Sequence, residues 1–330
     1  MRPFLMAFLL LAASPACADP TVFKFDVPGA VETRGSAISP SGIVAGTYRP
    51  HSAIDPCGQE CGFIRTPDGT ITTFGVFKAS SLTVSGINDD GTVAGSYVND
   101  RHFRGFVRTP DGVVTHVASH AGYNDVEDIN ESGTAVGFAT HKGHDQAFAW
   151  TPDRGITTFD DRRCQDIDAV GVNDSGTITG NCKTDGGYIG YLRAPDGGLT
   201  LFTAPGMRSV FVVGIDDSGA VVGYGGKGSF IRDSDGTFQS FAIPGDFITF
   251  VIAGMATVNG DRQVVGHING RYRRSLGFIQ HQDGSAETFD VTDGIARRSG
   301  TYVAGIAATG AITGSYSEDG DTVHGYIRLP

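Results

Sequence analysis

The chain has 330 residues, and 48 of them are glycine, a share about twice the usual ~7%. Its 25 Lys and Arg residues face 36 Asp and Glu residues, a formal net charge of -11, which argues against the basic surface that nucleic-acid binding requires. So much glycine also argues against helical bundles and coiled coils, because each glycine inside a helix costs about 1 kcal/mol relative to alanine.

The first 18 residues are predicted to be a secretory signal peptide. Arg2 supplies a short positive region, residues 4–13 form an apolar run, and residues 16–18 offer small side chains for cleavage. Such a run is too short for a membrane span, which takes about 20 residues. A lipoprotein, with Cys17 as the modified residue, is the alternative. We therefore expect an exported protein, secreted or periplasmic, with a single domain over residues 19–330.

From residue 31 onward, short motifs recur at a spacing of 42 to 49 residues. Each unit has an apolar run ending in glycine, then a small residue followed by an aromatic residue, and in most units an Asp-Gly turn. The run-ending glycines are Gly46, Gly95, Gly137, Gly180, Gly223, Gly266 and Gly314. Agreement of seven units in several registers indicates a tandem repeat.

Each unit is predicted to hold four short strands, called a to d. In the second unit, strand a ends at Gly86-Ile87, residues 88–91 form a turn rich in Asn, Asp and Gly, and three strands follow. Four strands per unit, repeated, are typical of β-propeller blades. The predicted fold is therefore all-β, a seven-bladed β-propeller of four-stranded antiparallel blades. The unit cores are expected near residues 31–77, 78–120, 121–162, 163–205, 206–245, 246–292 and 293–330, the last together with 21–27.

The two ends of the chain indicate how the ring closes. The seventh unit stops at Pro330 without a fourth strand, whereas residues 21–27 precede the first unit and match the fourth strands elsewhere. We expect residues 21–27 to be the outer strand of blade seven, with Phe25 beside the strand that holds Tyr326 and Ile327. Such closure hides strand edges that an open array would expose.

Four cysteines follow the signal peptide: Cys57, Cys61, Cys164 and Cys182. An even number in an exported chain favours two disulfides, and four cysteines allow three pairings. Order along the chain favours Cys57–Cys61 and Cys164–Cys182. Structural zinc at the first pair is the alternative, although no second close pair supports it.

Several segments carry a recurring motif, namely GINDDGTVAGSY, DINESGTAVGFA, GVNDSGTITGNC, HDQAFAW and HGYIRLP. In these segments the chain resembles the bacterial extracellular HAF-repeat family, over nearly all of its length after the signal peptide. The resemblance implies a propeller-like fold and contributes no catalytic motif. Two units depart from the pattern: Arg262 stands where the turn has glycine, and residues 307–309 replace the Asn-containing turn.

Strand a of each propeller blade lines the central channel, and the loops at one face of the ring are free to carry function. One position of strand a holds small residues in the other units but Asp128 in the third, preceded by Glu127. A carboxylate there is a candidate general base or ligand contact. The alternative is a hydrogen-bonded structural carboxylate.

Basic residues recur before strand a. They are Arg34, Lys78, His116, His120, Arg162, Arg163, Arg208, Arg297 and Arg298. A ring of these side chains would give an acidic protein a positive channel mouth, which favours an anionic ligand such as a carboxylated saccharide. The alternative is a set of dispersed surface cations paired with neighbouring aspartates, among them Asp160 and Asp161.

Three functional hypotheses follow. The first is an exported propeller that binds a ligand, a glycan or a protein partner through its loop face. The second is an enzyme at the channel mouth, most concretely a lyase or hydrolase for a uronate-type saccharide. Its catalytic candidates are His116, His120, Tyr123, Asp128, Arg162 and Arg163, and its ligand-binding candidates are Arg34, Arg208, Arg297 and Arg298. The third is a purely structural surface repeat. No cofactor, metal or membrane span is expected, and we expect a monomer.

Overall fold

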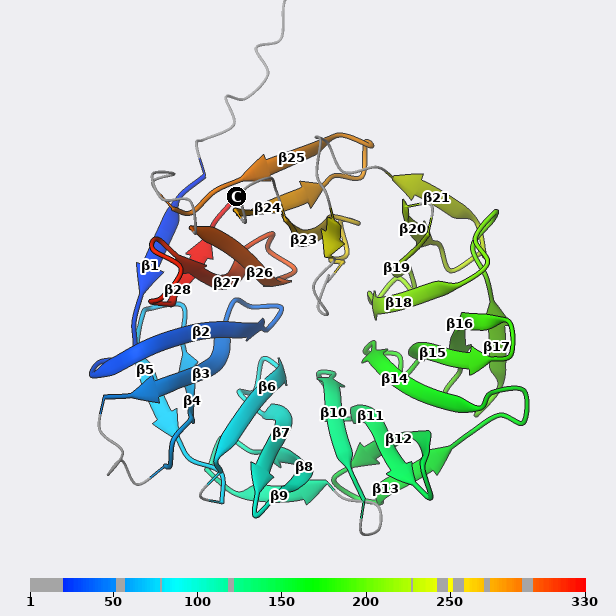
Figure 1. Cartoon of the computed structure of the whole chain (residues 1–330), viewed down its shortest axis with the longest axis horizontal. Helices are drawn as coiled ribbons and strands as arrows, with labels where there is room; N and C mark the ends of the chain where they lie inside the picture. Colours follow the sequence, from blue (N-terminus) through cyan, green and yellow to red (C-terminus); the bar gives the residue numbers. More distant parts are fainter. Residues whose placement is uncertain are drawn as a thin grey trace, which may run out of the picture.

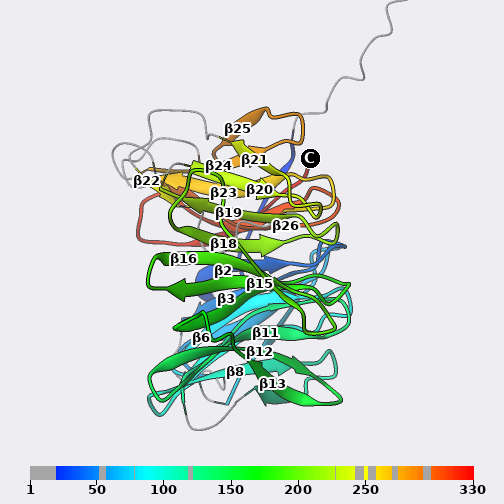
Figure 2. The same cartoon turned by 90° about the vertical axis from the view of Figure 1, so that its right-hand side faces the viewer.

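The computed structural model describes residues 20–51, 57–77, 79–117, 122–226, 228–241, 249–251, 258–269, 274–292 and 299–330. These residues form 28 strands and no helix. The strands build seven antiparallel blades around a central channel (Figure 1), and Figure 2 shows the same ring from its rim. The chain is therefore an all-β, seven-bladed propeller, as the repeat predicted.

Blades one to five are separate four-stranded sheets whose strands run in chain order from the axis to the rim. Blade one holds β2 (Ala30–Ile38), β3 (Val44–Pro50), β4 (Cys61–Arg65) and β5 (Ile71–Phe74), and blade two holds β6 (Ser81–Ile87), β7 (Val93–Asn99), β8 (His102–Arg108) and β9 (Val114–Val117). Blade three holds β10 (Asn124–Ile129), β11 (Ala135–His141), β12 (His144–Thr151) and β13 (Gly155–Phe159). Blade four holds β14 (Asp166–Val172), β15 (Ile178–Thr184), β16 (Gly187–Arg193) and β17 (Leu199–Phe202). Blade five holds β18 (Val210–Ile215), β19 (Val221–Gly225), β20 (Gly228–Arg232) and β21 (Phe238–Phe241).

The last two blades share one sheet, because a single parallel bridge joins Ser275 to Gly300. Blade six holds β22 (Thr249–Val251), β23 (Val264–Asn269), β24 (Ser275–Gln280) and β25 (Ala286–Phe289), and blade seven holds β26 (Gly300–Ile306), β27 (Ile312–Ser317), β28 (His324–Arg328) and β1 (Val22–Phe25). In β1, Phe23 pairs with Ile327 and Phe25 with Gly325. The predicted closure of the ring by the N-terminal strand is confirmed.

The turn between strands a and b depends on a left-handed residue. Gly91 has φ 81°, and Asn88 Oδ1 accepts a hydrogen bond from the Thr92 amide at 2.9 Å, which closes the turn from inside. In blade six, Arg262 takes the same conformation with φ 58° and forms an ion pair with Asp233. The contact helps to hold a non-glycine residue in a region that glycine occupies more easily.

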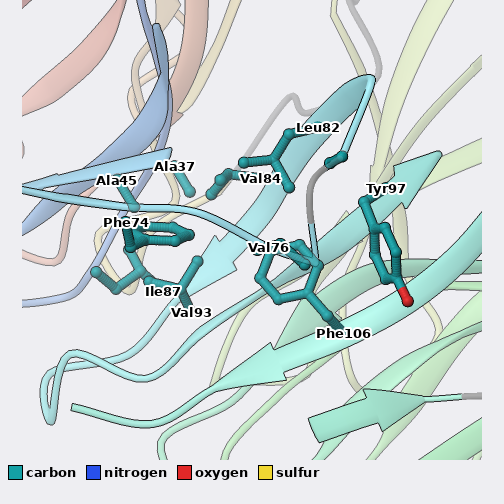
Figure 3. Packing of buried hydrophobic residues seen from close by; sticks show 11 residues of the cluster. Ala37, Ala45, Phe74, Val76, Leu82, Val84, Ile87, Val93, Tyr97 and Phe106 are labelled. Carbon is teal, nitrogen blue, oxygen red and sulfur yellow. The ribbon is translucent and has the colours of Figure 1, made fainter. Parts of the chain in front are cut away.

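The glycine that ends strand b and the aromatic residue of strand c form one packing unit. A side chain on Gly46 would meet the carbonyl oxygen of Arg34 at 1.9 Å and the ring of Phe63 at 2.8 Å. The strand-c aromatics are fully buried in every blade: Phe63, Phe106, Phe148, Tyr191, Phe230, Phe278 and Tyr326. Residues of adjacent blades share each apolar cluster, as Ala37 and Phe74 of blade one do with Val84 and Phe106 of blade two (Figure 3).

Two disulfides are present, with the pairing expected from chain order. Cys57 bonds to Cys61 at the start of β4, with a Cα–Cα distance of 5.7 Å. Cys164 bonds to Cys182, which ties the connection after blade three to strand b of blade four, with a Cα–Cα distance of 5.3 Å.

Candidate functional site at the channel

The two faces of the ring differ in what they carry. One bears the turns between strands a and b, and we call it the turn face. The other bears the b–c connections and the connections between blades, and we call it the loop face. A cavity of about 210 Å³ lies in the channel and is lined by residues of several a–b turns, so it opens at the turn face. Its lining acids are Glu127, Asp128, Glu131, Asp174, Asp216 and Asp217, and its lining includes no Lys or Arg among the described residues.

Asp128 lines this cavity, but its carboxylate has backbone partners. One oxygen accepts the Ile129 amide at 2.8 Å, and the other accepts the Val172 amide of blade four at 3.0 Å. Burial raises the pKa of Asp128 to about 7, although these two hydrogen bonds oppose the rise. The geometry therefore matches the structural alternative, because the carboxylate links two blades.

Glu127 lies beside it at a β-bulge, between Val126 and Asp128, where strand a has one residue more than its partner strand. Its carboxylate accepts no hydrogen bond within the part of the chain that the structure describes. Burial, and then the charges of Asp125, Asp168 and Asp128, raise the pKa of Glu127 to about 8. Among the described residues, Glu127 is the channel carboxylate with the least support from neighbouring donors.

The strand-a residues that precede this bulge lie nearer the loop face, and their pairing with strand b is the same in every blade. In each blade, one strand-a residue pairs with the residue that follows the strand-b glycine. These seven equivalent residues, which we call the mouth ring, are Arg34, Thr83, Asp125, Asp168, Phe211, Val251 and Tyr302. A repeat that is otherwise uniform thus places acids on blades three and four, aromatic residues on blades five and seven, and a cation on blade one.

The two mouth-ring acids differ in their hydrogen bonds. Asp125 accepts the Ser96 hydroxyl of blade two at 2.7 Å, and Asp168 accepts the Asn181 amide at 2.8 Å. Burial raises the pKa of both, to about 6 for Asp168, where the charge of Asp145 adds to the rise. The electrostatic contact between the two blades thus runs from Asp145 to Asp168, and from Asp168 to Glu127.

Tyr123 stands at the start of strand a, at the edge of this acidic region. It is 40% exposed, and its hydroxyl donates to Asp125 Oδ2 at 3.3 Å. Its ring stacks on Phe103 of blade two at a centroid distance of 4.3 Å and lies 5.7 Å from Phe138. Burial, then Asp125, Glu127 and Asp145, raise its pKa to about 12, which opposes a general-base role for this catalytic candidate.

The other predicted residues do not join Tyr123 and Asp128. His116 was expected in a loop at the mouth, but it belongs to the outer strand β9, where it stacks on Phe77 and hydrogen-bonds the Tyr97 hydroxyl at 2.5 Å. That expectation is wrong because His116 is the third residue of strand d, the outer strand of blade two, and does not lie in the connection before strand a. Arg162 and Arg208 are exposed.

Arg163 is held by Asp161 at 2.7 Å, which matches the paired-cation alternative. His120, Lys78, Arg297 and Arg298 lie outside the described residues. The positive ring of the loop face thus stays a prediction at these four positions. The described lining of the channel cavity, which opens at the turn face, is acidic. An anionic ligand in that cavity would meet like charge.

Sequence reasoning missed Asp125 and Asp168. The signal was available, since both depart from their counterparts in the other units. Their equal spacing before Gly137 and Gly180 makes the two positions equivalent in the sequence, and the strand pairing confirms it. The described residues contain no group of three or more His, Cys, Asp or Glu side chains arranged to hold a metal ion. They also contain no helix that would cross a membrane.

Known structures share this architecture at low sequence identity. Virginiamycin B lyase from Staphylococcus aureus is 14% identical, with a TM-score of 0.60, and the match covers 94% of this chain and all of that one. A streptogramin B lyase is 12% identical, with a TM-score of 0.59 and coverage of 94% and 98%. The β-propeller domain of the Trilobed protease from Pyrococcus furiosus is 11% identical, with a TM-score of 0.60 and coverage of 91% and 93%. Likeness at such identities shows the fold alone, and no family model and no curated protein sequence matches the chain.

Proposed function

We propose that the protein is an exported binding protein that takes an amine-bearing ligand at the loop-face mouth of its channel, beside blades three and four. The observation that carries the proposal is the asymmetry of the mouth ring, in which adjacent blades present Asp125 and Asp168. Glu127 lies one step deeper and interacts electrostatically with both. A bound cation would relieve the repulsion among these carboxylates, and a neutral ligand would not.

The stacked aromatic residues support the same ligand class. Tyr123 exposes part of its ring and is fixed by Phe103 and by its hydrogen bond to Asp125. An ammonium group is attracted to the face of such a ring by about 0.5–1 kcal/mol at an exposed site. A ring already held in place loses little conformational entropy on binding.

The proposal also includes export of the protein and its membership of the HAF-repeat family. Disulfides such as Cys164–Cys182 form and persist in oxidising compartments, which supports export. Assignment to the HAF-repeat family rests on the recurring motifs and is proposed on that basis.

A hydrolase that cleaves an amine-bearing saccharide at this site is the second candidate. It is favoured by Glu127, whose pKa of about 8 would keep it protonated at neutral pH, as a general acid must be. Asp168, with a pKa of about 6, would be mostly ionised there. If the protein is a hydrolase, oligosaccharides incubated with it should become shorter. If it is only a binding protein, they should remain intact.

The test compares saccharides that differ in charge. Isothermal titration is carried out with glucosamine oligomers, which are cationic, their N-acetylated forms, which are neutral, and galacturonate oligomers, which are anionic. We expect the glucosamine oligomers to bind best and to weaken as salt is added. Equal affinity for the cationic and neutral oligomers would contradict the proposal.

Single substitutions localise the binding. Asp125→Asn and Asp168→Asn should each weaken the binding of glucosamine oligomers about tenfold, which corresponds to about 1.4 kcal/mol. Asp90→Asn is the matched control, because it removes the same charge from an exposed turn on the opposite face. If all three variants bind alike, the mouth of blades three and four is not the site.

A further inference from the structure

A second cavity, of about 260 Å³, lies on blade one and reaches the start of blade two. Its lining includes Glu32, Arg34, Tyr48, Arg49, Glu60 and Ser80. It is separate from the acidic region of blades three and four, because no residue of that region contributes to its lining. Ligand pockets for drug-sized molecules are about 300–1,000 Å³, so a cavity of this size suits a smaller molecule.

Two guanidinium groups converge here on one carboxylate. Arg34 Nη2 lies 3.0 Å from Glu32 Oε2, and Arg49 Nη2 lies 2.5 Å from Glu32 Oε1. Each arginine uses a different oxygen, so Glu32 holds both planar groups in place. These three residues carry a net charge of +1, since two cations meet one anion.

The remaining acid of the cavity is engaged elsewhere. Glu60 Oε2 accepts the Leu82 amide at 3.1 Å and the Ser81 hydroxyl at 3.2 Å, at the start of strand a of blade two. These neutral donors fix Glu60 to the neighbouring blade and leave its charge in place, so the four charged side chains of the lining have a formal sum of zero. What the cavity offers a ligand is therefore the unused N–H donors of the two arginines.

The arginines also have donors to spare. Their side chains are 47% and 57% exposed, and a guanidinium group has five N–H donors, of which the pairing with Glu32 uses few. A planar fork of this kind matches the geometry of a carboxylate, which accepts two parallel hydrogen bonds.

Comparison with the other blades shows that the arrangement is specific to blade one. Glu32 pairs with Arg49 across strands a and b, and the equivalent pairs are Ser81 with Val98, Asp166 with Lys183, Thr249 with Asn269, and Gly300 with Ser317. Blade four has a similar ion pair, but its mouth-ring residue is Asp168 in place of arginine. The blade plan therefore does not require two arginines at this point.

We propose that the cavity on blade one is a binding site for a small monocarboxylate, of the size of a single uronate, in which Arg34 and Arg49 exchange part of their contact with Glu32 for the carboxylate of the ligand. Glu32 occupies the arginines in the free protein and keeps them oriented. The ligand carboxylate then takes donors that the internal carboxylate leaves unused. This site is additional to the amine site and does not depend on it.

The experiment measures the binding of galacturonate by isothermal titration, with galactose and inorganic phosphate as comparison ligands. We expect galacturonate to bind, galactose not to bind, and phosphate to bind at least tenfold more weakly. Arg34→Gln and Arg49→Gln should each weaken galacturonate binding at least tenfold. Arg154→Gln is the matched control, because Arg154 is an exposed arginine beside Asp153 on blade three.

Glu32→Gln separates a binding role from a structural one. The substitution removes the competing internal carboxylate, so galacturonate should bind several-fold more tightly even if the fold becomes less stable. Unchanged or weaker binding in this variant would overturn the proposed exchange, and equal binding of galacturonate by wild type and both arginine variants would overturn the site. Asp125→Asn should leave galacturonate binding unchanged, which keeps this outcome independent of the amine site.

Discussion

The side-chain amide of Asn130 in blade three donates a hydrogen bond to the backbone carbonyl of Asn173 in blade four, at 2.9 Å. The carbonyl oxygen of the same side chain accepts the Thr134 amide at 2.9 Å, which closes the turn of its own blade. Asn173 repeats the arrangement toward Asp216 of blade five at 3.1 Å. The recurring asparagine of the repeat thus performs two structural tasks, one within its blade and one between blades.

Asn130→Ala removes both contacts, and we expect it to lower the free energy of unfolding by about 1–3 kcal/mol. Asn130→Asp keeps the oxygen that closes the turn, loses the donor to blade four and adds a buried carboxyl group, so it is compared with wild type at pH 4, where more of that group is protonated. Urea unfolding of the two variants measures the difference. Equal stability of Asn130→Asp and wild type would show that the bond between blades contributes nothing.

Asp216 occupies the asparagine position in blade five, and we expect Asp216→Asn to stabilise the protein. Its Oδ2 is buried without a hydrogen-bond partner, and burial raises its pKa. An amide in this place would donate as Asn173 does, and relieving an unsatisfied buried group is worth about 1–3 kcal/mol.

The pH dependence of this gain follows from the direction of the shift. The folded state holds the proton of Asp216 more tightly than the unfolded chain does, so wild type loses stability as the pH rises from about 4 through the raised pKa. The advantage of Asp216→Asn should therefore be larger at pH 7 than at pH 4. Thermal unfolding at the two pH values checks this, and a constant difference would contradict the assignment.

The closure of the ring depends on a close approach between Gly325 and Phe25. A Cβ at residue 325 would lie 2.6 Å from the Phe25 ring, so Gly325→Ala should cost about 1–3 kcal/mol of unfolding free energy. In the Phe25→Ala background the same substitution should cost far less, and a double-mutant cycle measures the coupling. Gly226→Ala is the control, because nothing lies within 4 Å of its added Cβ. Additive costs would exclude this contact as the cause.

The two disulfides should contribute unequally. Cys164 and Cys182 are separated by 18 positions, and Cys57 and Cys61 by 4. In the chain-entropy description the longer loop stabilises more, by about 1 kcal/mol. Replacing both cysteines of one pair by serine, and comparing the urea midpoints of the two double variants, tests this order. A larger loss from the shorter loop would reverse it.

Glu127 should make the protein less stable in alkaline solution. Its pKa is raised to about 8 by burial and by Asp125, Asp168 and Asp128, so the folded state loses stability as the pH rises from about 4 through 8. Glu127→Gln should remove this loss and become the more stable protein above neutral pH. Glu318→Gln, an exposed position, is the control. Parallel stability curves for the Glu127 variant and wild type, measured from pH 5 to 9, would refute the assignment.

Much of the fold could be predicted because its signals are local. The strand-b glycine, the strand-c aromatic and the Asn-x-x-Gly turn each lie within a few residues, and the structure gives each one a steric or hydrogen-bonding reason. The closing strand was also predictable, since residues 21–27 repeat the end of the other units. Arg34 was a ligand-binding candidate as one of the recurring cations expected before strand a, and the structure places it within strand a, beside Glu32.

The sequence by itself determined the blade plan and its order around the ring, because that information is repeated and depends on near neighbours. Asp125 and Asp168 stand at the same spacing before Gly137 and Gly180, so the repeat itself makes them equivalent. Only the tertiary structure decided what these side chains contact, because Asp125 accepts the Ser96 hydroxyl of the neighbouring blade and Asp168 accepts the Asn181 amide of its own blade. The tertiary structure also showed that Asp161 pairs with Arg163 and that Glu32 pairs with two arginines. Such ion pairs depend on distances between side chains, which spacing along the chain does not give.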